Sequence, residues 1–511
     1  MPIFETILGL LLGASLLSML AQRINVPYPT LLAVGGALVA FLPGMPRLDL
    51  PPKLILALFV APVLLDAAHD ASLRDLRENW APILSLVMVA VGLTTVAVAV
   101  AARYFVPEMP WAAAVALGAL LAPPDAVAAL AVLRQVEPPH RIRNILEGES
   151  LLNDASSLLI YKLAVGAVAA GSFSVGKAIP AFGLVVVGSV VAGWLLAKLT
   201  GLLTVRMTDA PAAIIVQFVT TFGVWLLAEH LGLSGVVTIV VFAITAARRS
   251  TEAMPPSVRI PSFATWESIT FVLNVMAFTL IGLHVLPIIE GLRGHDQLGQ
   301  LGAALAILAV VVVVRLAWVL LYGFARRQTQ RAGQGDDSVE SRAQTFKSGL
   351  MVGWSGMRGI VTLAAALAIP RDFPQRDFIL LTAFTVVLGT LLVQGLTLQP
   401  LLLLLRLPKD GKVAREIALA RVATLKAAIA HLDNDPSDAA RRLGHEYRAA
   451  LEAVEKGRDP RHSRENVLRQ ELMPCTRQAL DELRDSGRIG DEAYRAVEQE
   501  LDWLELSSRP V

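Results

Sequence analysis

The stretch Glu147-Gly-Glu-Ser-Leu-Leu-Asn-Asp-Ala-Ser-Ser157 places acids, hydroxyls and a carboxamide at the start of a segment that stays apolar to about residue 171. In an α-helix, Glu149, Ser150, Asn153 and Asp154 fall within an arc of about 140°, and leucines fill much of the opposite side. Hard cations require oxygen ligands, and an ionisable residue inside an apolar span is costly and marks a functional site. The stretch therefore predicts a cation-binding helix face inside an apolar protein.

A second interpretation of the same stretch is a capped helix start near a membrane surface, with Ser150 as the cap. This interpretation leaves Asp154 unexplained, because that carboxylate lies one turn further into the leucine-rich segment. We therefore expect Asp154 to lie within the apolar layer.

The composition around this stretch is that of an integral membrane protein. The chain has 511 residues, of which 55% are hydrophobic and 17% are charged, whereas soluble domains are roughly 45–50% apolar. Of the 104 residues from Pro408 to Val511, 38 are charged, against 50 of the 407 residues before them. We therefore expect a transmembrane domain over residues 1–407 and a helical cytoplasmic tail over residues 408–511.

Several functional classes are disfavoured by charge and cysteine content. The net charge of +2 provides no basic field for nucleic acid, and the single cysteine, Cys475, excludes a disulfide framework and a multi-thiolate metal site. No HExxH or CxxC spacing occurs. We therefore expect no enzymatic activity, no cofactor and no nucleic-acid partner.

Apolar runs long enough to cross a ~30 Å hydrocarbon layer repeat along the first 407 residues. They predict an all-α protein of about thirteen spans, in which the first apolar run is a retained span rather than a signal peptide. The expected spans are 3–21, 28–43, 53–69, 80–102, 111–133, 145–171, 178–200, 211–230, 233–247, 264–288, 298–324, 347–369 and 376–405.

The connecting loops predict the orientation of these spans. One alternate set of loops contains 16 Lys and Arg residues and the other contains 7. Because loops rich in Lys and Arg stay in the cytoplasm, we expect the N-terminus outside and the tail in the cytoplasm.

The fifth span is interrupted by Pro123 and Pro124, directly before Asp125. Proline has no N–H group, so each one removes a helical hydrogen bond. Opened backbone at membrane depth is tolerated only where it is buried in protein or lines a wet cavity. The break therefore indicates a functional cavity, and a proline kink beside a chance carboxylate is the alternative.

The twelfth span is loosened in the same way by Gly353, Gly356 and Gly359 around Arg358, and Arg315 lies in the span before it. Two buried arginines among several buried acids predict structural ion pairs. The fifth and twelfth spans would each be the fifth span of an inverted six-span repeat. Interrupted spans at matching positions of two repeats indicate a transporter binding site near the midplane.

Three motifs together resemble the monovalent cation:proton antiporter-1 family, which includes the NhaP-type sodium/proton antiporters and their eukaryotic relatives. The motifs are Ala122-Pro-Pro-Asp125, Glu149-Ser-Leu-Leu-Asn-Asp154 and Gly353-Trp-Ser-Gly-Met-Arg-Gly359. The resemblance covers the whole membrane domain. It implies a homodimeric exchanger of Na⁺, or of K⁺ or Li⁺, for H⁺ in the bacterial inner membrane, with a role in pH homeostasis. Because the carboxamide of Asn153, directly before Asp154, cannot titrate, we expect the exchange to be electroneutral.

The resemblance also implies roles for individual residues. Asp154 would bind the cation or the proton, with Asn153 in support, and Ser150 and carbonyls near Pro123 would complete the cation shell. Glu149 would lie beside the site and pair with Arg315, while Arg358 would neutralise Asp125. Many members have threonine where this chain has Pro124, so only a carbonyl ligand is available from that residue.

Two other functional classes remain open on the residues alone. A cation channel could use the same acids for selectivity, and a K⁺/H⁺ exchanger regulated by its tail is a further alternative. A membrane-embedded hydrolase could use Asp125 and Asp154 as paired acids, but the sequence has no recognisable nucleophile–base set.

Overall fold

The computed structural model describes residues 2–24, 26–42, 51–70, 72–133, 138–170, 175–204, 207–291, 297–333, 342–407 and 411–508. The chain divides into two compact units, Met1–Lys409 and Asp410–Val511. All regular secondary structure in the described ranges is helical. The predicted all-α class is therefore confirmed.

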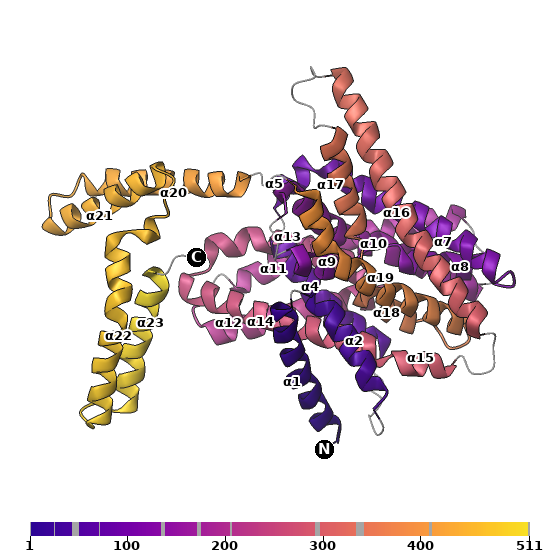
Figure 1. The fold of residues 1–511 in the computed structure, drawn as a ribbon, viewed down its shortest axis with the longest axis horizontal. Helices are drawn as coiled ribbons and strands as arrows, with labels where there is room; N and C mark the ends of the chain where they lie inside the picture. The colour runs from indigo at the N-terminus through magenta and orange to yellow at the C-terminus, as the bar shows by residue number, and fades with distance from the viewer. Residues whose placement is uncertain are drawn as a thin grey trace. The chain divides into compact units, whose positions relative to one another are not determined.

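The first unit consists of helices that run past one another in a closely packed bundle (Figure 1). In chain order these are α1 (Pro2–Arg23), α2 (Tyr28–Ala40), α3 (Pro52–Ile55), the π-helical η1 (Leu56–Val60), α4 (Ala61–Asp70), α5 (Leu73–Glu78), α6 (Trp80–Leu84), the π-helical η2 (Ser85–Ala90), α7 (Val91–Phe105), α8 (Trp111–Leu121), α9 (Ala126–Leu133), α10 (His140–Ala170), α11 (Val175–Thr204), α12 (Ala210–His230), α13 (Gly235–Ala253), α14 (Pro256–Leu283), α15 (Val285–Gly291), α16 (Gln297–Gly333), α17 (Arg342–Trp354), α18 (Ile360–Leu367) and α19 (Arg376–Leu405).

Eight helical segments of the described chain are long and apolar enough to cross a membrane. Four shorter apolar helices accompany them, at Tyr28–Ala40, Leu56–Ala68, Trp111–Leu121 and Gly235–Ala247. Large apolar side chains such as Leu184, Leu202 and Leu404 are exposed on the outside of this unit. An apolar outer surface of this kind is suited to lipid.

Several predicted boundaries were wrong because hydropathy detects the apolar part of a helix rather than its whole length. The span predicted at 264–288 begins at Pro256, and the span predicted at 298–324 continues to Gly333 through a charged stretch. The sixth span, predicted at 145–171, is part of one continuous helix, α10, that begins at His140. Ser150 therefore lies inside this helix and is not its N-cap.

The helices pack in two sets. One set, here called the α10 group, contains α7, α8, α10, α16, α17 and α19, and the other, the α14 group, contains α1, α2, α4, α11, α12, α13 and α14. Within each group the helices contact one another extensively, while fewer contacts join the groups. Lys162 of α10 and Glu229 of α12 form an ion pair of 2.9 Å that joins the two groups.

The second unit is a set of paired helices. Helix α20 (Lys412–Leu432) packs on α21 (Asp438–Glu455), and α22 (Arg464–Asp485) packs on α23 (Asp491–Ser508). Ser437 and Ser463 cap α21 and α22. Pro474 lies inside α22. Because Pro474 is exposed, water can bond the carbonyl that its missing N–H leaves free.

The closest backbone approach within the α14 group is between α2 and α14. A Cβ atom built on Gly36 would lie 2.3 Å from the carbonyl oxygen of Thr279, and one built on Gly282 would lie 2.2 Å from that of Ala33. Real Cβ atoms do not come this close to a backbone oxygen, so only glycine permits this contact. Small residues at such crossings allow two membrane helices to pack closely.

We expect Gly36→Ala to lower the melting temperature of the purified protein in detergent by several degrees. Its new methyl group would separate α2 from α14 by steric overlap, although alanine is the better helix former by about 1 kcal/mol. Gly9→Ala is the matched control, because nothing lies within 4 Å of a Cβ atom there. Melting temperatures that change equally in the two variants would contradict the packing.

Candidate functional site

Two interrupted helices meet at the centre of the α10 group. The first interruption lies between α8, which ends at Leu121, and α9, which begins at Ala126; the second lies between α17 and α18. They contact each other directly, because the Asp125 N–H donates a hydrogen bond of 2.6 Å to the Met357 carbonyl. The proline break and the glycine-rich break identified in the sequence are thus brought together.

Arg358 satisfies carbonyl groups at the ends of the interrupted helices. It is fully buried, and its Nε and Nη2 donate to the carbonyls of Leu121 at 3.0 Å and Ala122 at 3.3 Å, while Nη1 donates to that of Gly356. These carbonyls belong to the C-terminal end of α8 and the segment after α17. A cation is stabilised there, because a helix C-terminus carries partial negative charge.

Asp125 lies at the N-terminal ends of α9 and α18, the helices that follow the two interruptions. Its Oδ1 accepts a hydrogen bond of 2.8 Å from the Val127 N–H at the start of α9. Its Oδ2 approaches Gly359, the residue before α18, so closely that a Cβ atom there would lie 1.5 Å away. A carboxylate is stabilised at helix N-termini, which carry partial positive charge.

The expected pairing of Arg358 with Asp125 was therefore wrong. Arg358 donates its hydrogen bonds to carbonyls, and no ion pair joins these two described residues. Each charge instead complements the backbone groups that the two interruptions leave free. The sequence motifs contain both residues but do not show which backbone ends they face.

Arg315 and Glu149 form a buried ion pair between α16 and α10. The two guanidinium–carboxylate contacts are 2.5 and 2.8 Å long, and the side chains are 3% and 1% exposed. Arg315 also donates to the carbonyls of Val352 and Gly353 at the end of α17. The resemblance implies this pairing, and the two side chains form the ion pair in the structure.

Asn153 and Asp154 lie side by side on α10 but have different surroundings. Both are buried, and the Asn153 Nδ2 donates a hydrogen bond of 3.2 Å to the Pro124 carbonyl at the first interruption. The Asp154 carboxylate has no hydrogen-bond or ion-pair partner among the described residues, and Asp154 lines a cavity. Of the acids Asp125, Glu149 and Asp154, it is the one whose carboxylate no other described group satisfies.

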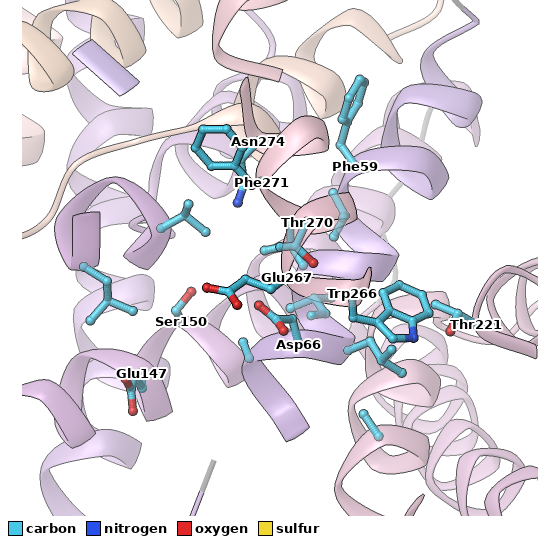
Figure 2. A pocket seen from close by; sticks show the side chains of 18 of the residues that line it. Phe59, Asp66, Glu147, Ser150, Thr221, Trp266, Glu267, Thr270, Phe271 and Asn274 are labelled. Carbon is cyan, nitrogen blue, oxygen red and sulfur yellow. The ribbon is translucent and has the colours of Figure 1, made fainter. Parts of the chain in front are cut away.

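The cavity has a volume of about 1030 Å³ and lies between the two helix groups. Its walls on the α10 side include Pro123, Asp125, Ser150 and Asp154, and its walls on the other side come mostly from α4, α12, α13 and α14. Figure 2 shows Ser150 of α10 pointing into the cavity, and Asp66 of α4 and Glu267 of α14 doing so from the facing side.

Other acidic and basic residues within the predicted spans also take defined places. Glu147 lines the cavity and pairs with Arg143 at 2.7 Å. Glu267 of α14 lines the same cavity. The sequence carried a signal for this position, since Glu267, Thr270 and Asn274 recur at helical spacing, but this polar pattern was not singled out.

Comparison with known proteins supplies the family. A family model described as "Sodium/hydrogen exchanger, transmembrane" matches residues 7–404. The chain belongs to the sodium/hydrogen exchanger family. As the three motifs implied, its relatives are monovalent cation:proton antiporters.

Individual relatives align with most of this chain. A sodium, potassium, lithium and rubidium/H⁺ antiporter from Bacillus pumilus is 30% identical over 98% of this chain and 77% of its own length. The low-affinity Na⁺/H⁺ antiporter NhaS1 from Synechocystis is 31% identical over 78% of this chain and 75% of its own length. The solved structure of the sodium proton antiporter MjNhaP1 from Methanocaldococcus jannaschii has the same fold, with a TM-score of 0.59, 18% identity and coverage of 79% of this chain and 99% of that one.

We expect Arg315→Ala to destabilise the protein by ~3–5 kcal/mol, because it strands the buried Glu149 carboxylate. Arg143→Ala is the control, since the Arg143 side chain is 47% exposed and its pair with Glu147 should contribute ~0.2–1 kcal/mol. Thermal melting in detergent measures both. A melting temperature of Arg315→Ala equal to that of the control would show that the buried pair does not hold α16 to α10.

Proposed function

We propose that this chain is a secondary active antiporter that exchanges a monovalent cation for H⁺ across the membrane, with Na⁺ as the first candidate and Li⁺ or K⁺ as alternatives. Membership of the exchanger family supports the reaction. The observation that carries the site is Asp154, a buried carboxylate without a partner among the described residues, on the wall of a large cavity.

The proposed mechanism is competition for Asp154. A buried carboxylate is unfavourable when it is ionised and unpaired. Either a proton or a cation relieves this cost, and the two exclude each other. If the carboxylate faces one side of the membrane and then the other, each release of one ion permits binding of the other, so no additional coupling device is needed.

The neighbouring groups would complete the cation shell. Ser150 lines the cavity one turn before Asp154, and the interrupted backbone at Pro123 lines it as well. Asn153 holds the Pro124 carbonyl and thereby fixes α10 to the interruption. Asp125, Glu149, Arg315 and Arg358 would act as structural charges that stabilise this crossing.

The proposed arrangement has thirteen spans if each interrupted pair, α8 with α9 and α17 with α18, counts as one. The proposal also includes inverted repeats with the interruptions in matching spans, and alternating access by movement of the α10 group against the α14 group. It further includes a homodimer in the inner membrane and a cytoplasmic tail. The cavity between the two groups supports such a movement. A carrier is favoured over a channel because the site has one free carboxylate among these acids rather than a charged ring.

We expect Asp154→Asn to abolish exchange without unfolding the protein. The substitution keeps the shape of the side chain and removes the group that binds the proton and the cation. Exchange is measured in proteoliposomes by a pH-sensitive dye after addition of Na⁺, Li⁺ or K⁺, and size-exclusion chromatography checks the fold. Exchange near the wild-type rate in a well-folded variant would contradict the assignment of Asp154.

We expect exchange to be electroneutral, one cation for one proton. Glu149 is held by Arg315 and Asp125 by the start of α9, so of the acids on the α10 side Asp154 alone would carry the cation or the proton across. The α10 group then carries the same net charge in both directions. The measurement is the initial rate in proteoliposomes under a potassium–valinomycin potential of either sign, with Na⁺ as substrate. Rates that depend on the potential, or charge displacement on a solid-supported membrane in proportion to turnover, would show that net charge moves.

A further inference from the structure

Helix α14 presents a polar stripe to the cavity, formed by Glu267, Thr270 and Asn274 at spacing i, i+3 and i+7. Thr270 is 6% exposed and Asn274 is 9% exposed. All three residues line the cavity, and Figure 2 shows the Glu267 carboxylate directed toward Ser150. The mechanism proposed above uses none of them.

Two members of this stripe are buried polar groups without partners. The Thr270 Oγ1 has no hydrogen-bond partner in the structure, and no described residue bonds the side chain of Asn274. A helical threonine normally donates to the carbonyl four residues earlier, as Thr279 of the same helix does to Val275 at 2.8 Å. Since an unsatisfied buried polar group is costly, a free hydroxyl at Thr270 indicates a ligand from the cavity.

The stripe repeats the pattern of the opposite wall. On α10, Glu147, Ser150 and Asp154 stand at the same spacing, and they line the same cavity. Each set therefore extends over about 10 Å of helix and consists of an acid, a hydroxyl and a terminal oxygen-bearing group. The two walls differ in one respect: Glu147 is paired with Arg143, whereas no described residue forms an ion pair with Glu267.

We propose that Glu267, Thr270 and Asn274 form a second subsite for the transported monovalent cation, which the ion occupies on its way to or from Asp154. This inference rests on the proposed function. The Glu267 carboxylate supplies the charge, and the Thr270 hydroxyl and the Asn274 carboxamide oxygen supply the neutral ligands that hard cations accept. Because the two stripes belong to different helix groups, the cation passes between them only when the groups bring them face to face.

The substitution that separates a ligand from a merely structural residue is Thr270→Val. It removes the hydroxyl and keeps the shape and charge. We expect the KM for Na⁺ in proteoliposomes to rise about three- to tenfold with kcat unchanged, and Thr270→Ser to restore it. If the hydroxyl binds nothing, its removal will leave KM unchanged and will not lower the melting temperature, and this result would overturn the subsite.

The charged member is tested by Glu267→Gln, with Glu5→Gln as the matched control, because Glu5 lies in the same helix group but away from the cavity. We expect Glu267→Gln to raise the KM for Na⁺ about tenfold and Glu5→Gln to leave it unchanged. Equal KM values in the two variants would exclude Glu267 from the subsite.

Direct binding separates failure of the subsite from failure of the proposed function. Purified Asp154→Asn should retain saturable but weaker ²²Na⁺ binding, and the added Glu267→Gln should abolish it. If Asp154→Asn shows no saturable binding, or if Glu267→Gln does not change it, the subsite is overturned while the function stands. The function itself fails only if Asp154→Asn still exchanges Na⁺ for H⁺.

Discussion

The contact between the two interrupted helices determines the rest of the membrane unit. Each interruption leaves backbone N–H and carbonyl groups without helical partners at membrane depth, where hydrocarbon cannot satisfy them. Arg358 takes up the carbonyls at Leu121 and Ala122, and Asp125 accepts from the Val127 N–H. Two opposite charges are thus required by the backbone itself. Because backbone groups hold Arg358 and Asp125, the proposed mechanism does not use either residue to exchange partners during transport.

The same division extends to the other buried charges. Arg315 bonds both the end of α17 and the Glu149 carboxylate, so this acid is also held in place. What remains is Asp154, next to Asn153, which fixes the helix to the interruption. On the proposed mechanism, Asp154 is the one titrating group because its neighbouring acids are paired, rather than because of any property of Asp154 alone.

The sequence predicts the parts of this arrangement better than their pairing. Pro123 and Pro124 lack N–H groups wherever they lie, so the break could be predicted, and helical periodicity alone places Asn153 and Asp154 on one face of α10. The partners of Arg358 could not be predicted, because they depend on which ends of α8 and α17 come together in space. Thr270 carried little signal, since most threonines in apolar helices bond their own backbone and only the structure shows that this one does not. The boundaries of α14 and α16 were missed because helices continue beyond the layer that hydropathy measures.

The size of the cavity has an electrical consequence. Its volume of about 1030 Å³ is far larger than the ~30 Å³ that one water molecule takes up in the liquid, so water can reach the wall that carries Asp154. Two turns further along α10, Tyr161 lies in an apolar cluster and donates a hydrogen bond to the Ala365 carbonyl. A transmembrane voltage falls mainly across low-dielectric packing of this kind rather than across a water-filled space. On the proposed mechanism, the layer through which Asp154 carries an ion across the field is therefore thinner than the full hydrocarbon layer.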